Sequence, residues 1–293
     1  MSNYVISCCS TVDLNKQQLE DRDIKYIYFH YELDGKQYDD DLWETMVSDD
    51  FYRAMEEGAD TKTSQVNAGE FEEYFETFLK EGKDIIHVTL ASGISGVLNS
   101  ALIAKGILEE RYPDRKIYVI DSLTASSGYG LLMEKLADLR DSGMSVDELA
   151  AWTEENKLKV QTWFFVTDLK YLVRGGRVSK VAGFMGNVLN ICPLLNIDEE
   201  GKLIPRQKIR GKKKVIEVLV NQMETFAEDG LDYSKSVNIV HSACPEDAEK
   251  VAELVKERFP KIEKVSVYCM GPTIGSHTGP GTVGLFFWGH REA

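Results

Sequence analysis

Short apolar runs alternate with helical patterns along the first half of the chain. Three runs, YVISCC, DIIHVTL and KIYVIDS, have the length and composition of buried strands. The last two are each followed by a small-residue loop and a helical pattern, within residues 92–112 and 126–143. Because the order of strand, loop and helix repeats, the pattern predicts a parallel sheet covered by helices.

Two further segments belong to this half. The stretch IKYIYFHYELDGKQY predicts a hairpin that turns at Asp34 and Gly35. The stretch SVDELAAWTEENK predicts a helix that begins with a capping box of Ser145 and Glu148. We assign all of these segments to a first domain, residues 1–160.

The second half combines strands and helices in another order. Residues 193–211 predict two antiparallel strands around an acidic-glycine turn, and residues 212–230 predict a long helix. Strands are expected at QTWFFVTD, VNIVHSA and KVSVYCM, and a helix that starts at Pro245. Mixed pairing of this kind predicts a mixed sheet in a second domain, residues 161–293.

Composition and charge narrow the class of protein. With 293 residues, 43% of them apolar, the chain is long enough for two domains and a full core. A net charge of −14 argues against nucleic acid as a partner, because phosphate binding needs a basic face. No apolar run is long enough for stable membrane insertion, and the first residues lack a secretory pattern. Five cysteines without framework spacing suit a reducing cytoplasm, and adjacent Cys8 and Cys9 fit buried thiols better than reactive ones.

The sequence context argues against three familiar kinds of site. Gly279 to Gly284 matches G-x-G-x-x-G, but the following LFFW predicts a strand, whereas a dinucleotide site needs a helix there. The stretch SGISGV resembles a nucleophile elbow, but Gly96 comes one position too early. The five histidines are scattered without ligand spacing, so neither a metal nor a cofactor is expected.

Hydroxyl groups collect where predicted strands end and helices begin. There, unpaired N–H groups and a partial positive charge favour a carboxylate or phosphate. The alternative is that these side chains merely cap helices. The residues concerned are Thr61, Thr63 and Ser64, then Ser92 and Ser95, then Asp121, Ser122 and Thr124.

Three other segments allow two interpretations each. Arg174 and Arg177 flank two glycines, an arrangement that either orients an anion or ends a helix with solvated arginines. Arg210, followed by three lysines, either meets an anionic or protein partner or is a solvated helix start. The apolar stretch 182–195 either fills the core or lines an adaptable tunnel.

Taken together and in order, these segments resemble the DegV family of bacterial fatty-acid-binding proteins. The resemblance rests on STVDL, TSQ at 63–65, SGISG, DS at 121–122, LKYLVRGGRVSK, KIRGKKK and SHTGPGTVG. It implies an α/β/α domain, a second α/β domain with a mixed sheet, and a long-chain fatty acid held between them.

The resemblance also implies site residues and a partner. Thr63 and Ser95 take the positions that bind the fatty-acid carboxylate in the family. A separate fatty-acid kinase is expected to phosphorylate the bound acid. His277 and Arg210 inherit a role on the side of that partner or of the phosphate, and Arg177, Ser64 and Ser122 are further candidates for the head-group side.

The chain departs from the family pattern in two places. Cys9 stands where the opening motif usually has Asp, and Val66 and Asn67 follow TSQ where Pro and a small residue are usual. Both departures are expected to act on pocket shape. Two rival functions remain open: a stand-alone hydrolase or phosphotransferase using His277, Asp121 and the arginines, or a binder of a smaller anion such as a sugar phosphate.

Overall fold

A computed structural model describes residues 3–179 and 190–291 and places the strands in three sheets. The N-terminal sheet has the order β2-β1-β6-β7 and is entirely parallel, as the repeated strand, loop and helix pattern predicted. Its members are β1 (Tyr4–Cys9), β2 (Ile24–Ile27), β6 (Asp84–Thr89) and β7 (Ile117–Asp121).

The predicted hairpin after β1 is correct only in its second part. β3 (His30–Leu33) and β4 (Lys36–Asp39) turn at Asp34 and Gly35, and β5 (Thr61–Ser64) joins them in a small antiparallel sheet. β2 belongs instead to the N-terminal sheet. The chain leaves that sheet at Phe29, whose amide donates a hydrogen bond to Ser10 Oγ (3.0 Å) rather than to a strand.

The C-terminal sheet is mixed, as expected, with the order β10-β9-β8-β13-β11-β12. Only β11 and β12 pair in parallel, and every other pair is antiparallel. Its members are β8 (Val160–Phe165), β9 (Ile191–Ile197), β10 (Leu203–Arg210), β11 (Val237–His241), β12 (Val265–Cys269) and β13 (Val283–Trp288).

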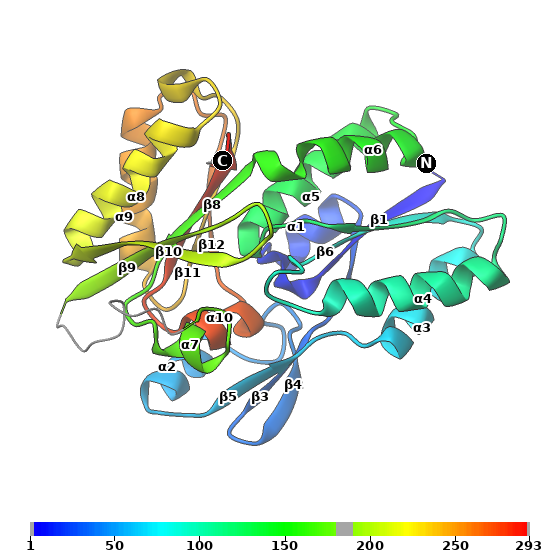
Figure 1. Cartoon of the computed structure of the whole chain (residues 1–293), viewed down its shortest axis with the longest axis horizontal. Coiled ribbons are helices and arrows are strands. Elements are labelled where there is room, and N and C mark those ends of the chain that lie inside the picture. Colours follow the sequence, from blue (N-terminus) through cyan, green and yellow to red (C-terminus); the bar gives the residue numbers. More distant parts are fainter. Residues whose placement is uncertain (1–2, 180–189, 292–293) are drawn as a thin grey trace.

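Helices and sheets are stacked in layers (Figure 1). α3 and α4 cover one face of the N-terminal sheet, α5 and α6 cover the other, and α8 and α9 cover the outer face of the C-terminal sheet. The α/β/α layer and the second α/β layer are thereby confirmed. The long helices are α3 (Ala68–Lys80), α4 (Val97–Arg111), α5 (Ser126–Asp141), α6 (Val146–Asn156), α8 (Lys212–Phe226) and α9 (Pro245–Arg258). The short ones are α1 (Lys16–Asp21), α2 (Ser48–Glu56), α7 (Lys170–Arg174) and α10 (Pro272–Thr278).

Helix α5 lies between the two large sheets and packs against both. Residues 126–133 are all buried, because each side of the helix meets a sheet. Gly128 allows the close approach on the C-terminal side: a Cβ there would lie 2.8 Å from the Phe286 ring. This helix therefore sets the separation of the two sheets.

Several local predictions are confirmed. Ser145 and Glu148 form the capping box that begins α6, and Pro245 occupies the first turn of α9. Cys8 and Cys9 are buried, and burial raises the pKa of both thiols. No helix within the described ranges is both long and apolar enough to cross a bilayer.

The glycine-rich stretch before β13, residues 271–282, contains the short helix α10. Pro272 starts it with a fixed φ, and Gly279 ends it at φ +78°. A Cβ at Gly275 or Gly279 would collide with Tyr52 or Tyr171, so these glycines accommodate tyrosines. The strand β13 follows directly, which confirms that the G-x-G-x-x-G match is no dinucleotide motif.

Two sequence predictions are left open. The apolar stretch 182–195 lies largely outside the described residues, and its described end forms part of β9. The domain boundary between residues 160 and 161 stays a prediction.

Two buried carboxyl groups lie where the halves of the molecule meet. Asp13 accepts a hydrogen bond from the Gly271 amide (2.9 Å), just before α10, and another from the Ser126 hydroxyl at the start of α5. Asp40 is also fully buried close to Gly271. Burial raises the pKa of Asp13 to about 8 and that of Asp40 to about 6.

We therefore expect Asp13 to make stability depend on pH. Since its folded-state pKa is raised, its contribution is complete below about pH 4 and is lost as pH rises toward 8. Relative to Asp13→Asn, the free energy of unfolding of the wild type should fall by at least about 1 kcal/mol over that range. Urea titrations of the wild type and of Asp13→Asn at pH 5 and 8.5 measure this change in the free energy of unfolding. Asp114→Asn, at an exposed position, is the control. A difference independent of pH would contradict the buried, protonated carboxyl.

Candidate functional site

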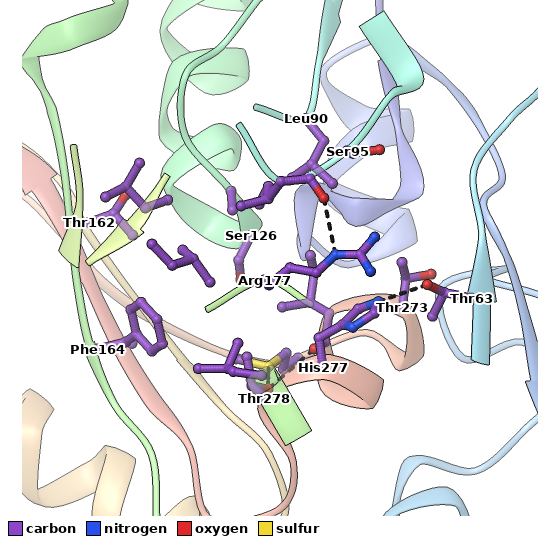
Figure 2. Close-up of a pocket in the computed structure, with 18 of the residues that line it drawn as sticks. Thr63, Leu90, Ser95, Ser126, Thr162, Phe164, Arg177, Thr273, His277 and Thr278 are labelled. Atoms are coloured by element: carbon purple, nitrogen blue, oxygen red, sulfur yellow. Dashed lines mark hydrogen bonds between the residues drawn. The ribbon is translucent and has the colours of Figure 1, made fainter. Parts of the chain in front are cut away.

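A cavity of about 340 Å³ is lined by residues from both halves of the chain (Figure 2). Its apolar lining consists of Phe29, Leu90, Ile94, Ala125, Phe164, Leu172, Ile197, Leu203, Val240, Met270, Ile274 and Phe286. The polar lining residues include Thr63, Ser64, Gln65, Ser95, Arg177 and His277. Figure 2 shows Thr63 and His277 together, with Thr162 and Phe164 on the far side of the cavity.

Thr63 and His277 are joined by a hydrogen bond, with Thr63 Oγ1 2.8 Å from His277 Nε2. Thr63 belongs to β5, whose pairing with β3 fixes its backbone, and His277 lies in the last turn of α10. Thr63 is therefore a strand residue of the small sheet and not a cap at the end of a parallel strand. The bond connects residues that are 214 positions apart in the chain.

Ser95 lies on the loop between β6 and α4, at the carboxyl end of the N-terminal sheet. Its hydroxyl contacts Gln65 Oε1 (3.3 Å) and the Val97 amide (3.3 Å). The Gln65 amide nitrogen in turn donates to Ser100 Oγ (3.0 Å) on α4. Gln65 thus links the segment of Thr63 to the loop of Ser95.

Arg177 brings a positive charge to this end of the cavity. Its Nε donates to the Ile94 carbonyl (3.1 Å), one residue before Ser95. In the part of the chain that the structure describes, no carboxylate lies within 4.0 Å of its guanidinium. Arg177 is partly buried, and this burial lowers its pKa. An anion bound here would supply the missing countercharge.

His277 is neutral at physiological pH. Burial, with Arg177 and Arg174 nearby, lowers its pKa to about 3. Nδ1 has no hydrogen-bond partner among the described residues and packs against Gly175, where a Cβ would lie 2.2 Å away. Gly175 thereby leaves room for the imidazole, a role that the sequence motif did not reveal.

The remaining sequence candidates lie in different surroundings. Ser64 lines the cavity, whereas Ser122 is fully buried and donates to the Thr124 carbonyl (3.0 Å) within its own turn. Asp121 accepts from the amides of Ser92 and Leu123 and does not line the cavity. The strands therefore bring together only part of the predicted hydroxyl cluster.

Arg210 also lies outside the cavity lining. It is exposed at the last position of β10, while Leu203 at the first position of that strand lines the cavity. The two residues are seven steps apart along the strand, which corresponds to roughly 23 Å.

A family model describing uncharacterised proteins of the DegV family matches residues 6–289. The chain belongs to the DegV family. A DegV domain-containing protein of Clostridium perfringens is 37% identical over 292 residues, which cover 100% of this chain and 99% of that protein.

Solved structures of the family have the same fold. A DegV lipid-binding protein from Thermotoga maritima is 30% identical, with a TM-score of 0.86 and 100% of both chains covered. Another T. maritima protein, described as revealing fatty-acid-binding function, is 29% identical, with a TM-score of 0.84, and the match covers 99% of this chain and 100% of that one. One of these two relatives is thus described as lipid-binding and the other as fatty-acid-binding.

The three residues that depart from the usual DegV pattern lie outside the cavity lining. Cys9 is buried with its sulfur 3.6 Å from His87 Nε2, and Val66 is also fully buried. Asn67 caps α3 by accepting from the Glu70 amide (3.1 Å). None of the three lines the cavity. Their expected influence on pocket shape stays a prediction and has to act through neighbouring side chains.

Sequence reasoning missed most of the apolar lining of this DegV protein. Phe29, Ile197 and Phe286 come from three separate segments, and each looks in the sequence like any other core residue. No local signal distinguishes a cavity wall from a packed core. Gln65 lies within the TSQ motif, but its bridging role depends on α4 being adjacent.

We expect the His277 imidazole to remain neutral between pH 5 and 8. An exposed imidazole titrates in this range, whereas burial and two arginines keep the pKa of His277 near 3. Nitrogen-15 NMR of the histidine rings checks this, with the His277→Gln spectrum identifying the resonance. A midpoint near pH 6.5 would contradict the buried arrangement.

Proposed function

We propose that this protein is a cytoplasmic carrier that binds a long-chain fatty acid and presents its carboxylate to a separate fatty-acid kinase. The observation that carries the proposal is one largely apolar cavity that ends at a partly buried arginine without an acidic partner among the described residues. Its fatty-acid-binding relatives support the ligand class.

The apolar lining suits an acyl chain. Each buried methylene contributes about 0.8 kcal/mol, so the chain supplies most of the affinity. The cavity of about 340 Å³ falls within the usual range for small-molecule sites. A sugar phosphate would leave the apolar part of this lining without a matching ligand surface, which argues against the smaller-anion alternative.

The polar end suits a carboxylate. In our proposal the Thr63 and Ser95 hydroxyls donate to its two oxygens, and Arg177 supplies the countercharge with Ser64 close by. In this arrangement two neutral hydroxyls direct the carboxylate toward the partner kinase, and one cation balances its charge.

The stand-alone enzyme alternative lacks support from the site. A histidine that acts as a general base is usually oriented by a carboxylate on its second nitrogen. Within the described ranges, His277 Nδ1 has no such partner, and Asp121 is engaged with backbone amides. We therefore assign the chemical step to the partner kinase, with His277 and the exposed Arg210 on the partner side. Ser122, buried in its turn, is the weakest of the head-group candidates.

A mass spectrum of the purified protein, recorded natively and after organic extraction, tests the ligand class. We expect a stoichiometric adduct that extracts as a long-chain fatty acid, because the apolar cavity retains it during purification. A protein free of ligand that takes up no added fatty acid would refute the proposal. Uptake of sugar phosphates instead would favour the smaller anion.

Replacing both hydroxyls tests the head-group assignment. Thr63→Val with Ser95→Ala should weaken fatty-acid binding at least about 100-fold, since each hydrogen bond to a charged group contributes about 1.5–3 kcal/mol. Melting temperature should stay within a few degrees. The matched control is Thr77→Val with Ser142→Ala, both exposed, the first on α3 and the second directly after α5. Unchanged affinity in the Thr63 and Ser95 variant would refute these two ligands.

Arg210→Ala separates binding from presentation. Because Arg210 is exposed and outside the cavity lining, fatty-acid affinity should be unchanged. Acyl-phosphate formation with ATP and a bacterial fatty-acid kinase, trapped with hydroxylamine, should fall about 10-fold, as for loss of one interface arginine. Arg53→Ala, an exposed arginine on α2, serves as control. Equal acyl-phosphate yields in both variants would remove Arg210 from the partner surface.

A further inference from the structure

The loop that carries Ser95 is held on its outer side by a turn from the C-terminal sheet. We define the Ser95 loop as residues 90–96 and the β9–β10 turn as residues 198–202. Gly93 lies directly against this turn: a Cβ at Gly93 would be 2.5 Å from both the carbonyl carbon and the oxygen of Gly201. These are backbone atoms, so no side-chain movement relieves such a clash.

The turn itself is rigidly organised. Asp198 Oδ1 accepts hydrogen bonds from the amides of Glu200 (3.0 Å) and Lys202 (2.8 Å), and Gly201 adopts φ +75°. A Cβ at Gly201 would lie 3.0 Å from the Ala91 side chain, on the opposite flank of the Ser95 loop. The turn and the loop therefore contact each other through two glycines.

A single arginine fixes this turn to the rest of the molecule. Arg291 donates to the Asp198 carbonyl (2.6 Å) in the turn, to the Leu123 carbonyl (2.8 Å) after β7, and to the Val160 carbonyl (3.3 Å) at the start of β8. Its guanidinium thus bridges the turn, the N-terminal half and the C-terminal sheet. Burial lowers its pKa to about 10, so the charge that makes these bonds strong is present at neutral pH.

We infer that Arg291 is a positioning residue for fatty-acid binding, which acts through the β9–β10 turn and the Gly93–Gly201 contact to place Ser95. This inference rests on the proposed function, because Ser95 is there a carboxylate ligand. Ile197 and Leu203, on either side of the turn, also line the cavity. Arg177, which lines the cavity, donates to the Ile94 carbonyl of the Ser95 loop. Arg291 acts on that loop through the β9–β10 turn, where it donates to the Asp198 carbonyl.

A double-mutant cycle tests the coupling. Arg291→Met removes the donors and keeps an apolar stem, and it should weaken fatty-acid binding about 10-fold. In a Ser95→Ala background, the same change should alter affinity less than about 3-fold, because its effect passes through Ser95. Binding of the fatty alcohol of equal length should likewise change little, since that ligand has no carboxylate. Additive effects, or equal losses for acid and alcohol, would overturn the inference.

A second measurement needs no ligand. Hydrogen exchange of amides in residues 90–97 should accelerate in Arg291→Met and in Gly93→Ala, with Arg291→Lys in between because it retains the charge. The controls are Arg53→Met on the surface and Gly106→Ala, where a Cβ would meet nothing within 4 Å. Unchanged exchange would refute the role of Arg291 in positioning the Ser95 loop. If the wild type binds no fatty acid but exchange accelerates as expected, the proposed function fails, whereas the effect of Arg291 on the Ser95 loop is supported.

Discussion

Helix α5 is buried on both faces, and the arrangement of the other elements depends on this. It packs against the parallel sheet on one side and the mixed sheet on the other. Because an α-helix has a fixed diameter, it holds the two sheets a helix-width apart. The cavity lies beside the first turn of α5, where Ala125 and Ser126 line it. The cavity is thus a consequence of the layer that separates the sheets.

The polar end of the cavity depends on a charge that the described protein leaves unmatched. Arg177 is partly buried and bonded to backbone carbonyls, which orient it but do not neutralise it. A neutral His277 beside it avoids adding a second buried charge. In our proposal an incoming carboxylate supplies the missing countercharge, and the hydroxyls of Thr63 and Ser95 direct it. The apolar walls and the arginine without an acidic partner together favour the amphipathic acid that we propose as the ligand.

Close contacts between the two halves of the chain leave the segments around this site little room to move. Asp13 joins the first turn of α5 to the segment that begins α10, the helix of His277. On the other side, Gly93 and Gly201 bring the Ser95 loop against the β9–β10 turn. Substitutions that add a single methyl group at these contacts act on the head-group site from a distance, because close-packed backbone cannot absorb the added volume.

The sequence by itself determined the parallel and mixed sheets, the capping box of α6 and the rejection of the dinucleotide motif. Each depends on neighbouring residues, whose periodicity and turn chemistry are local properties. The ordered motifs also identified the family and, with it, the candidate pair Thr63 and Ser95. Only the tertiary structure decided which candidates meet: it placed Thr63 beside His277, buried Ser122 in its own turn and left Arg210 exposed. These outcomes, like the apolar lining and the Arg291 bridge, arise from contacts between segments far apart in the chain, and no local pattern encodes such distances.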